Sequence, residues 1–97
     1  MATNTCISEI TYTSIADAYA EPFFSIRQGQ ADAMFNEGKT EYSPNVVEWN
    51  LPTVEDPTGR RFWVDHAAAQ EFIDWTVATA ATYNMNIVST SIEDLPV

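Results

Sequence analysis

The stretch RRFWVDHAAAQEFIDWTVATAATYNMNIVSTSIEDL, residues 60–95, decides the fold class. Arg60 to Val64 is a short β-type run, and it is followed directly by Asp65, a residue type that caps helix N-termini. An alanine-rich helical stretch then runs from about His66 to Tyr83, and Met85 to Ile92 is again β-type. The sequence therefore predicts one strand–helix–strand unit over the last third of the chain.

Apolar and small side chains recur along the helical stretch at offsets of three and four. They are Ala69, Phe72, Ile73, Thr76, Val77 and Ala80. This spacing predicts an amphipathic helix, and the small members of the stripe allow it to lie close to a sheet. Asn84 tolerates a left-handed backbone and is predicted to end the helix.

The N-terminal part begins with a predicted strand from Cys6 to Ser14. Cys6, Ile10 and Tyr12 alternate with polar residues there, as in a half-buried strand. Ser14 and Asp17 then resemble a capping box.

Residues 16–27 leave two interpretations open. In one, Pro22 starts a helix in which Phe23, Ile26, Gln30 and Met34 share a face. In the other, residues 23–27 form a strand and residues 30–36 form a short helix. A helix over residues 30–37, stopped at Gly38, is the prediction that we retain.

The middle of the chain predicts a β-hairpin. Val46 to Leu51 alternates as a strand does, and Pro52 ends it because proline cannot donate to a sheet ladder. Asp56 to Gly59 has the residue types of a type I turn, after which the next strand starts at Arg60. Two strands joined in this way are expected to pair antiparallel.

The predicted order is strand, helical region, strand, strand, helix, strand. This order resembles the ferredoxin-like plait, an α+β fold in which helices cover one face of a small antiparallel sheet. Many such plaits bury the other sheet face by dimerising, so the resemblance implies a homodimer. Trp49 and Trp63 lie on adjacent predicted strands. Either both fill the core or both lie at an interface.

Charge limits the classes of partner. The 97 residues, enough for a single domain, include fourteen acidic and four basic side chains and carry a formal net charge of −10. Nucleic acids and anionic membranes both need a basic surface, so we expect neither as a partner. The acid excess serves solubility, or it mimics a polyanion and occupies a DNA-binding protein.

The search for catalytic chemistry finds no motif. The single histidine, His66, and the single cysteine, Cys6, exclude the usual clusters of metal ligands, and the three glycines are too far apart for a phosphate loop. Asp65 and His66 are adjacent on a helix and therefore do not face each other as a dyad. We expect no cofactor, no metal and no catalytic residue, and the N-terminus has no secretory signal.

The stretch FWVDHAAAQEFIDW, residues 62–75, followed by Tyr83-Asn84 and by Ile92-Glu93-Asp94, resembles small orphan proteins of tailed phages of marine cyanobacteria. Those proteins often carry an alanine-glutamine-acid-phenylalanine helix after a short aromatic strand. The resemblance implies a viral accessory or structural protein, located in the host cytoplasm or in the virion. It provides no functional residues for transfer to this chain.

These observations predict a non-enzymatic protein-interaction or structural module that binds itself or a protein partner. The expected contact residues are Trp49, Arg60, Arg61 and Trp63, because aromatic residues and arginine are enriched at interfaces. One alternative is an acidic inhibitor or DNA mimic that blocks a host enzyme. Another is a small cofactor-free enzyme or ligand carrier of the plait type, which would need an enclosed apolar pocket.

Overall fold

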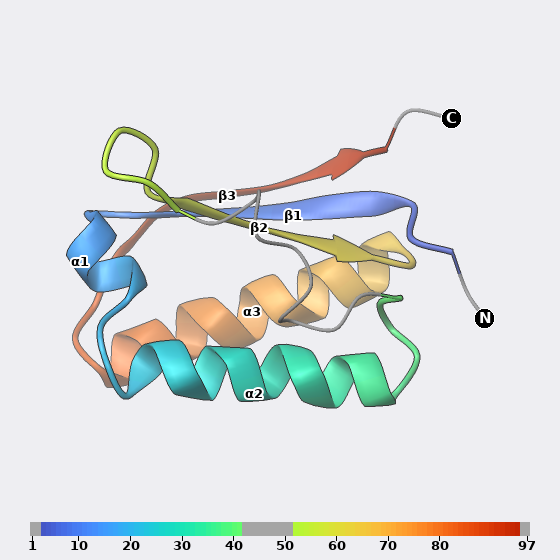
Figure 1. Cartoon of the computed structure of the whole chain (residues 1–97), viewed down its shortest axis with the longest axis horizontal. Coiled ribbons are helices and arrows are strands. Elements are labelled where there is room, and N and C mark those ends of the chain that lie inside the picture. The colour runs from blue at the N-terminus through green and yellow to red at the C-terminus, as the bar shows by residue number, and fades with distance from the viewer. Residues whose placement is uncertain (1–2, 42–51, 96–97) are drawn as a thin grey trace.

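The computed structural model describes residues 3–41 and 52–95. The elements, in chain order, are β1 (Cys6–Tyr12), α1 (Ile15–Ala18), α2 (Phe23–Asn36), β2 (Thr58–Trp63), α3 (His66–Thr82) and β3 (Ile87–Asp94). Helices α2 and α3 lie side by side on one face of the sheet, and α1 lies at one end of it (Figure 1). No helix within the described ranges is long and apolar enough to cross a bilayer.

The described sheet has the strand order β2-β1-β3, and both pairings are antiparallel. Strands β2 and β3 therefore run parallel to each other with β1 between them, and α3 connects the two. The predicted α+β class, an antiparallel sheet with helices on one face, is confirmed at this level. The expected strand over Val46–Leu51, which includes Trp49, lies outside the described residues, so the structure shows three strands rather than four.

The side chains of β1 alternate between a buried face and a partly open face of the sheet, as the sequence predicts. Cys6, Ser8, Ile10 and Tyr12 are buried toward the helices, while the three residues between them are only partly covered. Trp63 on β2 and Phe72 on α3 complete the centre of the core, with ring centroids 5.0 Å apart. The core therefore lies between the helix layer and the central strand.

The predicted helix ends are confirmed. The Ser14 side chain accepts a hydrogen bond from the backbone N–H of Asp17 at 3.3 Å, and Asp65 Oδ1 accepts one from the N–H of Ala68 at 2.8 Å. At the other ends, Gly38 (φ 80°) and Asn84 (φ 58°) adopt the left-handed conformation that stops α2 and α3.

Helix α2 resolves the open question at residues 16–27. It begins at Phe23 and continues through Gly29, so the alternative strand over residues 23–27 is wrong. Its buried residues are Phe23, Arg27, Ala31 and Met34, whereas Ile26 is 38% exposed. The predicted face was wrong at Ile26 because Arg27, whose side chain packs against aromatic rings, occupies the inner side at this level.

The turn before β2 also differs from the prediction. Here the carbonyl of Asp56 accepts hydrogen bonds from the N–H of Thr53 at 2.9 Å and from the N–H of Thr58 at 2.7 Å, and not from the N–H of Gly59 as a type I turn would require. Strand β2 then starts at Thr58, two residues earlier than expected, because Thr58 and Gly59 pair with β1. At the C-terminal end, β3 covers Ile87–Asp94, so it starts two residues later and ends two residues later than the predicted run from Met85 to Ile92.

Candidate interaction surface

Trp63 lies in the core. Its side chain is fully buried, and Nε1 donates a hydrogen bond to the Ser8 hydroxyl at 2.8 Å. The face that Trp63 shares with Arg61 is the face that the helices cover. Trp63 therefore fills the core and does not lie at an exposed interface.

Arg60 and Arg61 are adjacent in sequence but lie on opposite faces of β2. Arg61 points toward the helices, where Nη2 donates a hydrogen bond to Gln28 Oε1 at 2.8 Å and the guanidinium lies 5.5 Å from the Phe72 ring centroid. Burial, together with the positive charge of Arg27, lowers the pKa of Arg61 to about 10. Arg61 therefore remains a cation at neutral pH and contributes to the inside of the fold.

Arg27 is a buried cation that the sequence analysis missed. It is 5% exposed, and Nη2 donates a hydrogen bond to the Ala18 carbonyl at 2.7 Å, at the end of α1. Its guanidinium carbon lies 4.9–5.4 Å from the centroids of three aromatic rings, those of Tyr12, Phe23 and Phe24. Burial lowers the pKa of Arg27. These contacts tie α1 to α2, and the spacing of Arg27 four residues after Phe23 is the signal that could have found it.

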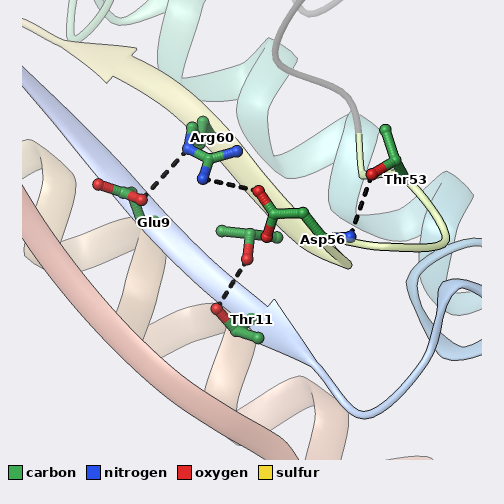
Figure 2. Close-up of polar contacts among 6 residues, drawn as sticks. Glu9, Thr11, Thr53, Asp56 and Arg60 are labelled. Carbon is green, nitrogen blue, oxygen red and sulfur yellow. Dashed lines mark hydrogen bonds and ion pairs between the residues drawn. The ribbon is translucent and has the colours of Figure 1, made fainter.

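Arg60 lies on the open face of the sheet in a small polar network (Figure 2). Nε pairs with Glu9 Oε2 at 3.2 Å across the strands, and Nη2 pairs with Asp56 Oδ2 at 3.0 Å. Beside this network the hydroxyls of Thr11 and Thr58 share a hydrogen bond of 2.9 Å. The network fixes the turn before β2 to the start of that strand.

The ionisation of this network follows from its contacts. A hydrogen bond from the Thr58 side chain, and then one from Arg60, lower the pKa of the Asp56 carboxyl. The hydrogen bond to Asp56 in turn raises the pKa of Arg60. Arg60 is thus already matched by two carboxylates, and a partner with an acidic patch would have to compete with them.

Lys39 completes the set of basic side chains. Its Nζ lies 2.8 Å from Glu71 Oε1 and 3.1 Å from Glu37 Oε1, and the hydrogen bond to Glu71 is the main cause that raises its pKa. All four basic residues of the chain are therefore engaged within the fold, two by carboxylates and two by carbonyl or amide oxygens and aromatic rings. The remaining acidic side chains determine the sign of the surface charge.

Strand β3 is an edge of the described sheet, and most of it is exposed. Ile87 and Ile92 are partly covered, whereas the other six residues of the strand are exposed, including Val88 at 64%. The N–H of Leu95 donates to the Thr5 carbonyl at 2.8 Å, which shows that the backbone groups of Leu95 point toward β1. Because these groups alternate along a strand, those of Thr90 and Ile92 point away from β1.

We call residues 88–92 the β3 edge. Within the described ranges, no element pairs with its outer side. The edge reads Val-Ser-Thr-Ser-Ile and contains no charge, no lysine and no proline, the devices by which natural proteins usually protect an open strand. A strand is predictable here from the sequence, and the run of small hydroxyl residues is the signal that could have indicated its exposure.

His66 occupies the first turn of α3, and its Nε2 contacts Asp94 Oδ1 at the end of β3. The contact is exposed and joins the helix to the strand. In the described part of the chain, no group of three or more histidine, cysteine or acidic side chains could hold a metal ion.

Comparisons of the chain with models of protein families, with curated proteins and with solved structures found no match.

Proposed function

We propose that this protein is a non-enzymatic interaction module whose contact surface is the β3 edge. The observation that carries the proposal is the exposed and uncharged β3 edge, whose outer backbone groups have no partner among the described residues. Such an edge is a template to which a strand of another chain can add, since backbone hydrogen bonds supply affinity and alternate side chains supply specificity. The partner is a second copy or another protein with an extended segment.

The contact surface that we propose differs from the one expected from sequence. Trp63 and Arg61 face the helices, Arg60 is held by Glu9 and Asp56, and Trp49 lies outside the described residues. Among Arg60, Arg61 and Trp63, Arg60 alone lies on the open face. It can bind a partner only if its ion pairs with Glu9 and Asp56 break. The proposal therefore moves the contact from β2 to β3.

The ferredoxin-like arrangement remains part of the proposal. A split βαβ unit, with β1 between two parallel strands that a helix connects, is half of that plait, and β2-α3-β3 has this form around β1. The plait needs one more strand beside β2, and the hairpin predicted from sequence supports one. In that arrangement β3 is still at an edge, so the proposed contact surface is unchanged.

An acidic inhibitor of a nucleic-acid-binding enzyme is a second candidate, favoured by the engagement of all four cations inside the fold. A phage accessory role is compatible with either candidate. The salt dependence of binding distinguishes the two candidates, because a contact between an acidic surface and a basic partner weakens as ionic strength rises. Strand pairing through uncharged residues does not weaken in this way.

A pair of matched variants tests the proposal. Val88→Lys introduces a charge on the β3 edge, while Val54→Lys introduces the same charge at a valine that is 76% exposed in the loop before β2. We expect self-association, or capture of a protein from the native host, to be lost in Val88→Lys and kept in Val54→Lys. Equal behaviour of the two folded variants, as judged by circular dichroism, would contradict the proposal.

A further inference from the structure

We infer that the occupant of the β3 edge is the β3 strand of a second copy, paired antiparallel about a two-fold axis at Thr90. This inference rests on the proposed function and names its partner. It extends the described sheet from three strands to six across the two subunits.

The residues of the strand are self-complementary about Thr90. In this register Val88 lies opposite Ile92 of the partner subunit, and Ser89 lies opposite Ser91 of the partner subunit. The symmetry creates each pair twice, so two apolar pairs flank a centre of hydroxyl residues. Val88, now 64% exposed at the register shift of β3 against Thr11 and Tyr12, gains an apolar neighbour across the new strand pair.

The backbone groups of the strand have the direction that this axis requires. A two-fold axis at one residue of an antiparallel pair makes that residue face its own copy. The N–H and carbonyl of Thr90 point away from β1, because Leu95, five positions further along, bonds to Thr5 of β1. Thr90 and its copy can therefore exchange two hydrogen bonds. An axis at Ser91 would use the same outward groups, with Ser91 as a non-hydrogen-bonded pair, but it would place Val88 opposite Asp94 of the partner subunit, so the side chains favour Thr90.

The charges of the strand also permit a second copy to approach. Each copy carries a net charge of −10, so like-charge repulsion opposes most contacts between copies. Residues 87–92 are uncharged, and the register places Glu93 opposite Ile87 of the partner subunit rather than opposite another acid. Asp94 already contacts His66 of its own chain. The β3 edge is thus a stretch where two acidic copies meet without paired acids.

Cysteine cross-linking tests the register. In Thr90→Cys the two introduced residues lie opposite each other with Cα atoms about 5.5 Å apart, within the range of a disulfide. In Val88→Cys the introduced residue is offset from its copy by four positions, roughly 14 Å at ~3.4 Å per residue. The native Cys6 is buried and is present in both variants, so any cross-linking through Cys6 is the same in the two experiments.

Under mild oxidation we expect Thr90→Cys to become mostly covalent dimer and Val88→Cys to stay largely monomeric. Equal cross-linking of both, or cross-linking of neither, would overturn the inference. Sedimentation of the wild-type chain as a monomer at about 100 μM, where a dimer with a micromolar Kd would be mostly formed, would overturn it as well. That outcome leaves the proposed function standing if Val88→Lys still abolishes capture of another protein, so the two failures are distinguishable.

We expect salt to strengthen the dimer, because it screens the repulsion between copies.

Discussion

Strands β2 and β3 flank the same central strand, yet they differ in almost every physical property. Strand β2 has three buried residues, Thr58, Phe62 and Trp63, and it carries two arginines that are bonded within the molecule. Strand β3 has six exposed residues and a centre of serine and threonine. The difference teaches that pairing with β1 does not by itself define a strand's role: β2 builds the core, while β3 keeps one edge and much of both faces available for contact.

The largest expected effect separates the two strands by stability. Trp63→Ala removes a fully buried ring that packs on Phe72 and bonds Ser8, so we expect the free energy of unfolding to fall by ~3–5 kcal/mol. In the dissociated monomer, Val88→Ala on the exposed strand should change it by no more than about 0.5 kcal/mol. Denaturant titration of both variants at a fixed concentration measures the difference. Similar losses of unfolding free energy in the two variants would contradict the difference between β2 and β3.

The start of α3 sharpens the comparison, because it is tied on one side to the end of β2 and on the other to β3. Asp65→Ala should cost about 1 kcal/mol, since the N–H of Ala68 loses its acceptor. His66→Ala removes only an exposed contact with Asp94 and should cost less than about 0.5 kcal/mol. Thermal unfolding of both variants provides the measurement. A larger loss in His66→Ala would show that the contact with β3 stabilises the start of this helix more than the Asp65 cap does.

The smallest expected effect concerns ionisation at the open face of β2. The lowered pKa of Asp56 means that its contribution to stability is present above the unfolded-state pKa and is lost as pH falls through the folded-state value. We expect Thr58→Val to raise this pKa toward its ordinary value by more than Arg60→Gln does, because the Thr58 hydrogen bond is the larger cause. Carboxyl NMR titration of Asp56 decides the order. A larger rise in Arg60→Gln would show that the ion pair dominates.

Local chemistry made a large part of the fold predictable from sequence. The alternation in β1, the Asp65 cap, the stripe on α3 and the stops at Gly38 and Asn84 all follow from short-range rules. The start of α2 was less predictable, because Pro22 both interrupts one helical run and precedes another. The inner position of Arg27 depends on rings from β1 and α2 together, so the helical periodicity of apolar residues alone placed Ile26 there instead.

The candidate surface was harder to predict than the fold. Trp63 and Arg61 have the residue types of an interface, but the sheet turns them toward the helices, and this depends on the pairing of β2 with β1. Val88 and Thr90 have the pattern of a half-buried strand, but they remain exposed because β3 is the end of the described sheet order. Strand order is a non-local property, so residue types along β3 could indicate a strand without indicating an open edge.

The central claim is that the outer side of β3 pairs with a second copy, and amide hydrogen exchange tests it most directly. The N–H groups of Ser89 and Ser91 face β1, while those of Thr90 and Ile92 face outward, so a single strand supplies both the probe and its control. We predict slow exchange at all four positions, with protection of Thr90 and Ile92 that rises with protein concentration. Rapid exchange of Thr90 and Ile92 at every concentration, beside protected Ser89 and Ser91, would contradict the account.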